Sequence, residues 1–444
     1  MATPATLTTT DAFFVAYQER AGILMHLGAE LVLAGSLDRG ALEAAVGAAV
    51  TRWPALESTL ARTIGGLRWR AGAHRMVFED TEPALERWRN TPVDPFREPP
   101  FGVLWIQRSA TAHVLAFRCH HAVADGMLFL AIVGEILTAL ASRAAPSSEQ
   151  AARAQPEGER TARERTVGER AEGERTAGHP LGFAQLWRDT KLSASWATAR
   201  TLAREGRADR SARVALRDET AGAIACCDRR IAAAGRAAIV ERARAEEVRP
   251  AWIVAAAWLQ ALHAWNARRG VENATLSIEV PVSLRRGPHA MTGTGNHLTV
   301  LTLFGDAREP LGTLARSLWD DYVAAIRRRD HLAVPLFASP ARLLPWPVFR
   351  RVAVTTTSTG FATSHFTWIE HDPDFRAETR ERSGGALTVT DQRFYTPVCL
   401  RMGVALGVMA WPDELQLSIT HRLTGLTAAD AGELADLVRE KLPA

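Results

Sequence analysis

The most constraining feature of this chain is the segment 112–141, in which an apolar run, a turn with two histidines and a helical run follow one another. The turn reads CHHAVADG at 119–126, in a chain with only 13 histidines among 444 residues. A strand that ends in a histidine-bearing loop and continues into a helix places an imidazole on a rigid scaffold beside a crevice. Because the unperturbed pKa of histidine is about 6.5, its neutral ring can act as a general base at cellular pH.

The string HHxxxDG, formed by His120, His121, Asp125 and Gly126, resembles the active-site signature of the chloramphenicol-acetyltransferase-like superfamily. Nonribosomal peptide condensation domains, acyl-CoA acyltransferases and wax-ester synthases belong to this group. The resemblance implies that His121 deprotonates an alcohol or amine that attacks a thioester. It also implies that Asp125 is structural and holds the loop through an ion pair with an arginine from the other half of the protein.

Further segments extend the resemblance over most of the chain. The sequence VPVSLR at 280–285 resembles the PVxxR segment of condensation and wax-ester-synthase-type enzymes, which favours Arg285 as the partner of Asp125. The adjacent Arg286 is the alternative. The sequence Gly295-Asn296-His297 resembles the GN element that lies near the substrate crevice in these families, which makes Asn296 and His297 candidate substrate-lining residues, although a simple turn before a strand would have the same sequence. The opening segments 10–14, 25–28 and 52–56 are also similar, whereas the plant-type DFGWG motif is absent.

The residues of the HHxxxDG loop are also compatible with roles other than the one that the resemblance implies. His120 is expected to be structural, because adjacent residues at a strand end point in opposite directions. The same geometry weakens a metal site, and no third ligand stands at a zinc spacing. Asp125 as a partner that orients His121, and His421 as a rival base, remain alternatives. Ser364 and His365 are candidate donors to the oxyanion. Gly126 lets the chain turn sharply before the helix.

The length and the order of elements predict an α/β protein with α+β-like lobes, since hairpins and strand–helix units are mixed. The resemblance implies two chloramphenicol-acetyltransferase-like lobes with a tunnel between them. We expect an N-terminal lobe at 1–145, a charged low-complexity linker at 146–180 and a C-terminal lobe at 181–444. The segment 415–422 and the helix after it repeat the plan of strand, histidine and helix, which indicates an internal duplication.

Periodicity and cap signals give the expected elements. Helices are expected at 8–20, 41–52, 127–141, 232–245, 250–269 and 428–442. Strands are expected at 24–33, 58–64, 67–71, 102–107, 112–119, 224–231, 274–281, 298–304, 353–359, 366–369, 398–408 and 415–420. The segment 335–351, rich in proline, arginine and bulky apolar residues, is compatible with a lid, a membrane-surface patch or a buried irregular loop.

Composition limits the functional classes. An apolar content of 47%, a charged content of 23% and a net charge of +4 are typical of a globular protein that does not bind nucleic acid. Four cysteines without CxxC spacing favour a reducing compartment, and we expect a cytoplasmic protein without a signal peptide. The apolar run 127–141 is interrupted by Glu135 and is too short to cross a membrane, so no transmembrane segment is expected. Neither a GxSxG elbow, a P-loop nor a GxGxxG is present.

These observations predict an acyltransferase with no permanently bound cofactor and no metal. Its donor would be a CoA thioester or an acyl group on the phosphopantetheine of a carrier protein, and its acceptor a small molecule with a hydroxyl or an amine. A non-catalytic module that recruits a carrier protein, and a hydrolase or cyclase that activates water at His121, are the alternatives.

Overall fold

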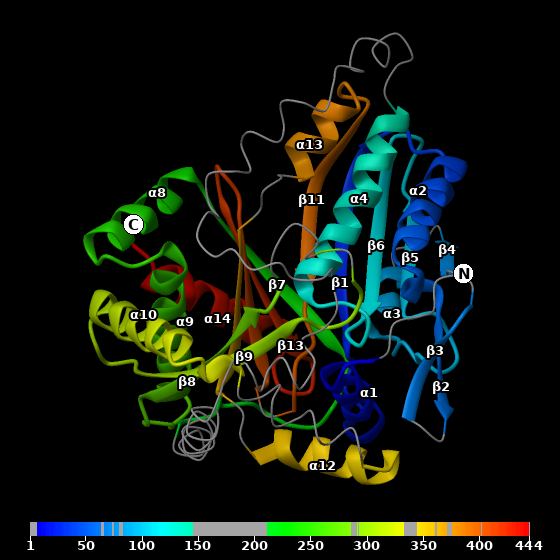
Figure 1. Cartoon of the computed structure of the whole chain (residues 1–444). Helices are drawn as coiled ribbons and strands as arrows, with labels where there is room; N and C mark the ends of the chain where they lie inside the picture. The colour runs from blue at the N-terminus through cyan, green and yellow to red at the C-terminus, as the bar shows by residue number, and fades with distance from the viewer. Residues whose placement is uncertain are drawn as a thin grey trace.

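The fold consists of two sheets with helices packed on them, which stand side by side as two lobes (Figure 1). The computed structural model describes residues 7–63, 66–72, 75–79, 83–144, 211–285, 291, 293–332, 344–359, 362–370, 375–400 and 402–443. A two-stranded hairpin of β2 (Thr59–Thr63) and β3 (Gly66–Arg70) stands beside the first lobe. The α/β class predicted from the sequence is confirmed.

The first lobe is built on a five-stranded sheet in the order β11-β1-β6-β5-β4. Its central strand β6 pairs antiparallel with β1 and β5, and β4 runs parallel to β5. Leu115 and Phe117 pack with the helices α2 and α4, whereas Val114 and Ala116 pack with α3 on the other face. The bounds are α2 (Arg39–Arg52), α3 (Pro83–Asn90), α4 (Gly126–Ala144), β1 (His26–Gly35), β4 (Arg75–Glu79), β5 (Phe101–Gln107), β6 (Ala112–His120) and β11 (Leu387–Tyr395).

The second lobe is built on a six-stranded mixed sheet in the order β7-β13-β12-β10-β8-β9. Strand β10 runs parallel to β8 and β12, and the other pairs are antiparallel. The bounds are β7 (Ile224–Ile231), α8 (Ala233–Ala245), α9 (Pro250–Ala267), β8 (Thr275–Ser283), β9 (Leu298–Asp306), α10 (Leu311–Arg327), β10 (Ser364–Glu370), β12 (Val404–Ala410), β13 (Leu415–Arg422) and α14 (Ala428–Lys441).

The two faces of this second sheet differ in chemistry. One face is apolar and packs with the helices through residues such as Ile278, Phe366 and Leu417. Side chains alternate along a strand, so the neighbouring positions point to the opposite face. Many of those positions are polar or small, among them Glu279, His365, Thr367, Gly407, Gln416, Ser418 and Thr420, while Ile369 and Met409 are the apolar exceptions in β10 and β12. Gln416 on this face donates to the backbone of Gln392 in β11, which shows that the face is turned toward the first lobe.

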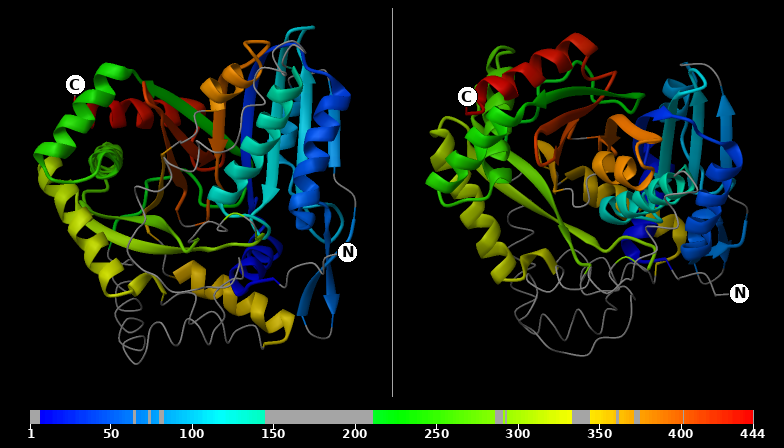
Figure 2. Two further views of the ribbon diagram at one scale, coloured as in Figure 1. Left: turned by 45° about the horizontal axis from the view of Figure 1, so that its top comes forward. Right: turned by 90° about the horizontal axis from the view of Figure 1, so that it is seen from above.

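One segment of the C-terminal half crosses to the first lobe. After β10, the helix α13 (Phe375–Arg382) packs on α4, and β11 pairs antiparallel with β1 along the edge of the first sheet (Figure 2). The helices α1 (Thr9–Ala21) and α12 (Trp346–Thr359) pack together through Ala16, Phe349 and Ala353. The expected division at 1–145, 146–180 and 181–444 stays a prediction, because the linker lies outside the described residues.

Most predicted elements form close to their expected bounds, and the corrections have physical causes. The strand expected at 353–359 is wrong, because this β-branched segment is the end of helix α12, which packs on α1. The strand expected at 398–408 begins only at Val404. Strand β11 was missed, because a bulge opposite Val32 and Leu33 breaks its alternation of apolar residues. Also missed were β4, α3, α10 and α13. Arg286 and residues 335–343 lie outside the described part of the chain.

Helix α4 has 19 residues and is therefore longer than its predicted bounds of 127–141. By length and composition alone this helix could cross a membrane, so the expectation that the segment is too short to do so is wrong. Its buried residues, among them Leu128, Ile132 and Ile136, belong to the core of the first lobe, which accounts for the apolar composition. The four cysteines are all free thiols.

The close approach of Tyr395 to Gly28 in the β1–β11 ladder gives a stability prediction. A Cβ atom at Gly28 would overlap the buried Tyr395 ring, so Gly28→Ala should lower the free energy of unfolding by about 1–3 kcal/mol. Gly47 in α2 is the matched control, since an added Cβ would meet no atom within 4 Å. Gly47→Ala should raise the free energy of unfolding by up to about 1 kcal/mol. Urea denaturation measures both, and a Gly28→Ala protein as stable as the wild type would contradict the packing.

Candidate active site

The histidine loop connects the central strand β6 with helix α4 and is fixed at its start by backbone hydrogen bonds. The His120 N–H donates to the Pro100 carbonyl at 2.7 Å, and the His121 N–H donates to the Met25 carbonyl at 2.8 Å. The chain then turns within four residues, because the Val123 N–H donates to the His120 carbonyl at 3.0 Å. Two neighbouring segments therefore set the position at which the His121 side chain leaves the sheet.

His120 is fully buried and closes the turn from inside. Its Nδ1 accepts the Ala122 N–H at 3.0 Å, which places the ring proton on Nε2. Burial, with a smaller contribution from the nearby rings of His26 and His121, lowers the pKa of His120 to about 3. The ring is therefore neutral at all physiological pH values. This geometry supports the structural role predicted for His120.

His121 points the other way and lies against the first helix of the chain. Its ring stacks on Phe14 of α1, with centroids 4.1 Å apart and planes inclined by 18°. Burial lowers the pKa of His121, while the negative charge of Asp125 acts in the opposite direction. Hydrogen bonds to the Asn296 side chain and to the residue's own backbone also raise this pKa. Within the described residues, Nδ1 of the ring has no hydrogen-bond partner. A neutral imidazole with an open ring nitrogen is able to accept a proton from a substrate.

Asp125 is turned away from His121 and is saturated by other partners. Its Oδ2 accepts Arg285 Nε at 2.8 Å and the His297 N–H at 3.0 Å. Its Oδ1 accepts the Leu128 N–H at 2.9 Å in the first turn of α4. The side chains of the pair are only 2% and 4% exposed, so this is a buried and well-satisfied ion pair between the lobes. The contacts fit the structural role predicted for Asp125 and Arg285 and leave no carboxylate oxygen for a catalytic triad.

The segment 293–297 of the second lobe is joined to the histidine loop. Ala124 and Gly295 form a parallel bridge, and the Gly295 N–H donates to the Val123 carbonyl at 2.5 Å. Gly295 has a φ of 96°, in the left-handed region that favours glycine. Arg285 donates to the carbonyls of Gly293 and Gly295, and Asn296 Nδ2 donates to the His121 carbonyl. The predicted residues Asn296 and His297 therefore lie directly at the loop.

Asp11 is a site residue that sequence reasoning missed. It stands in the first turn of α1, where it forms a capping box with Thr8. Its Oδ1 also accepts the Asn296 N–H at 2.8 Å and Asn296 Nδ2 at 2.9 Å, and the residue is 2% exposed. Burial raises the pKa of Asp11, whereas these hydrogen bonds lower it. The sequence signalled only the cap, since the contact with Asn296 joins positions far apart in the chain.

The remaining candidates lie in different places. Ser364 is fully buried toward the helices of the second lobe, where its Oγ accepts Trp258 Nε1 at 2.8 Å. His365 lies on the opposite face of β10, and its charge contributes to the lowered pKa of His121. His421 stands two residues after Ile419 and four after Leu417, so it shares their face of β13. This is the helix-facing side of the sheet, away from the histidine loop. Within the described residues, no group of three His, Cys, Asp or Glu side chains is placed to hold a metal ion.

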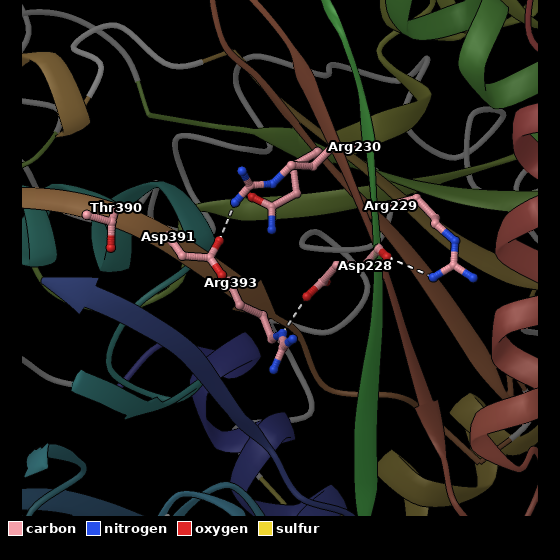
Figure 3. A pocket seen from close by; sticks show the side chains of 7 residues that line it. Asp228, Arg229, Arg230, Thr390, Asp391 and Arg393 are labelled. Carbon is pink, nitrogen blue, oxygen red and sulfur yellow. Dashed lines mark hydrogen bonds and ion pairs between the residues drawn. The ribbon is translucent and has the colours of Figure 1, made fainter. Parts of the chain in front are cut away.

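A separate polar pocket of about 470 Å³ lies where β7 and β11 meet (Figure 3). Arg393 donates to Asp228 at 2.5 Å and Arg230 pairs with Asp391, so both contacts join the two lobes. Arg393 also lies 3.4 Å from Glu30 in β1. None of the candidate site residues lines this pocket, whose cations are already paired with carboxylates. It is a polar contact between the lobes.

Comparison with known proteins finds similarity in solved structures only, since no family model and no curated protein matches the chain. The starter condensation domain of rhizomide synthetase RzmA, in a complex with C8-CoA and Leu-SNAC, is 16% identical with a TM-score of 0.65, over 99% of this chain and 93% of that one. The first condensation domain of the calcium-dependent antibiotic synthetase, with a substrate analogue, is 16% identical with a TM-score of 0.66, over 99% and 95%. The X-domain in complex with OxyB from teicoplanin biosynthesis is 17% identical with a TM-score of 0.58, over 99% and 95%.

These matches cover nearly the whole chain. The protein therefore has the two-lobed α/β fold of these condensation domains, and the fold that the resemblance through HHxxxDG implied is confirmed.

The buried Asp125–Arg285 pair predicts a large loss of stability when one partner is removed. Arg285→Ala leaves a buried carboxylate without its cation and should cost about 3–5 kcal/mol of unfolding free energy, measured by urea denaturation. Arg39→Ala is the control, because its pair with Glu43 is largely exposed and should matter much less. An Arg285→Ala protein of wild-type stability would contradict the role of the pair.

The two adjacent histidines of the β1–β6 ladder, His26 and His120, predict a loss of stability in acid. Burial lowers the pKa of each ring to about 3 in the folded protein, against about 6.5 when unfolded. Below about pH 6.5 the unfolded chain takes up protons that the folded chain does not, so the unfolding free energy falls toward pH 3. In His120→Asn, where an amide oxygen can replace Nδ1, this fall should be shallower between pH 6 and 4. Equal slopes in urea denaturation would contradict the burial of a neutral His120.

Proposed function

We propose that this protein is an acyltransferase that moves an acyl group from a CoA or carrier-protein thioester to a hydroxyl or amine acceptor. The observation that carries the proposal is the imidazole of His121, at a loop that contacts from both lobes hold in place. Burial lowers the pKa of this ring, and its Nδ1 has no hydrogen-bond partner within the described residues. Such positioning supplies much of the rate when two substrates must meet in one orientation.

The reaction needs only one protein group to move a proton. As the acceptor oxygen or nitrogen attacks the thioester carbonyl, His121 takes the proton of the attacking group. The tetrahedral intermediate then expels the thiolate as the carbon–sulfur bond breaks, and the imidazolium returns its proton to the sulfur. The products are an ester or amide and a free thiol, and no covalent acyl-enzyme forms.

The similar structures support the class of donor. The RzmA domain was solved with C8-CoA, an acyl thioester, and the antibiotic-synthetase domain with a substrate analogue. Octanoyl-CoA is therefore a suitable first donor, and the same acyl group on a carrier protein is the second. A cytoplasmic location agrees with free cysteines and intracellular thioesters, and it stays a prediction.

A non-catalytic module that recruits a partner is the second candidate. It is favoured by the similarity to the X-domain, which was solved in complex with OxyB. A binding module has no need of a base at the histidine loop, so the conformation of His121 favours catalysis. A hydrolase or cyclase would release thiol without an added acceptor, which the assay below distinguishes.

The test is thiol release from octanoyl-CoA with pooled alcohol and amine acceptors, followed for the wild type and for His121→Ala. The variant should lose about 10²–10⁴-fold in rate, the usual contribution of a general base, and keep its circular dichroism spectrum. His263→Gln on α9 is the control and should keep full activity. Release that persists in His121→Ala would refute the assignment. Release in neither protein, repeated with an acylated carrier protein, would favour the binding module.

The pH profile gives an independent check of the base. Because burial lowers the pKa of His121, the acid-side decline of kcat/KM should have its midpoint below pH 6.5, the ordinary value for a histidine. A midpoint above pH 6.5 would contradict a neutral, desolvated base.

A further inference from the structure

The polar face of the second sheet carries a buried carboxylate that the proposed mechanism does not use. Glu279 stands in β8, between Ile278 and Val280, which both pack toward the helices. It therefore points to the opposite face, toward the first lobe. The residue is only 6% exposed, and its direct neighbour across the parallel β8–β10 pair is His365.

The neighbours of Glu279 do not saturate it. His365 is held by a contact of 2.7 Å between its Nε2 and Thr367 Oγ1, and its Nδ1 lies 3.8 Å from Glu279 Oε1. A distance of 3.8 Å is beyond hydrogen-bond range, so within the described part of the chain the carboxylate accepts no hydrogen bond. The buried carboxylates of Asp11 and Asp125 each accept three or more. A buried carboxylate with open acceptor positions is costly unless a ligand fills them.

Glu279 lies on the face of the second sheet that is turned toward the first lobe, the lobe that carries His121. The charge of its neighbour His365 contributes to the lowered pKa of His121. Burial, together with the charge of Glu279, raises the pKa of the Cys399 thiol to about 12. Cys399 and Phe14 both pack on the cluster that contains Tyr17, and Phe14 stacks on His121.

We propose that Glu279 binds an ammonium group of the acceptor, and that this ammonium is not the group that attacks. A buried carboxylate favours the protonated form of an amine beside it, and a protonated amine has no lone pair for attack. The nucleophile is then a second group on the same molecule, directed at His121. The acceptor class is therefore an amino alcohol or a diamine. This inference rests on the proposed function and adds the substrate class.

His365 and Thr367 act as positioning residues in this arrangement. The Thr367 hydroxyl fixes the ring, and the ring forms one wall beside the carboxylate. Two oxygens of Glu279 remain available to a ligand with several N–H donors, which an ammonium group supplies and a neutral alcohol does not.

The test uses ethanolamine and its three- and four-carbon homologues, each paired with the alcohol in which a methyl group replaces the ammonium. Ligand-detected NMR measures weak binding to the intact protein without turnover. At least one amino alcohol should bind about tenfold more tightly than its paired alcohol, as expected for hydrogen bonds to a charged group. Glu279→Gln should remove this preference, Glu279→Asp should keep part of it, and Glu440→Gln on the exposed side of α14 should leave it unchanged.

Binding and turnover separate the two proposals. If the wild type shows no preference for any amino alcohol, or if Glu279→Gln keeps the preference while remaining folded, the assignment of Glu279 is overturned whatever the activity. If the preference is present and depends on Glu279 but no thiol is released, the binding site stands and the acyltransferase proposal fails. In the turnover assay, Glu279→Gln should raise KM for the amino alcohol by a larger factor than KM for the paired alcohol.

Discussion

The arrangement of the candidate site depends on the buried ion pair between Asp125 and Arg285. The Asp125 carboxylate accepts hydrogen bonds from the Arg285 guanidinium of the second lobe and from the His297 N–H beside it. It also accepts the N–H of Leu128 in the first turn of α4. The same guanidinium donates to the carbonyls of Gly293 and Gly295. A single buried contact therefore orders the start of a core helix, the histidine loop and the loop opposite it. Because each group satisfies the other, neither charge is left unpaired in the interior.

The position of the proposed base, His121, therefore requires contacts from both lobes. The first lobe supplies the strand that carries His121, the second lobe supplies Asn296, and α1 supplies Phe14 and Asp11. Nδ1 of the ring has no hydrogen-bond partner within the described residues, although the backbone of His121 is held on several sides. A rigid backbone with an uncommitted side chain is the arrangement that proton transfer needs.

The sequence predicted those parts of the site that lie on continuous segments. The strand and helix around His120 and His121 were placed within a few residues, and the PVxxR segment pointed to Arg285. The role of Asp11 in the site could not be predicted from the sequence, because its short-range signal is a helix cap and its contact with Asn296 depends on the tertiary fold. Strand β11 was missed because its alternation is interrupted, and Glu279 because one acidic residue in a strand says nothing about its partners.

Because β11 comes late in the chain and pairs with β1 of the first sheet, it affects how the first lobe folds during synthesis. Its register joins Gly28 to Tyr395, so the outer edge of β1 has no partner until the segment 387–395 has left the ribosome. An unpaired strand edge is a template for aggregation, and contacts between distant segments slow folding. The N-terminal lobe therefore cannot finish as an independent unit during synthesis. A nascent chain truncated before 387 would expose β1, and cellular yield would depend on chaperones that shield that edge.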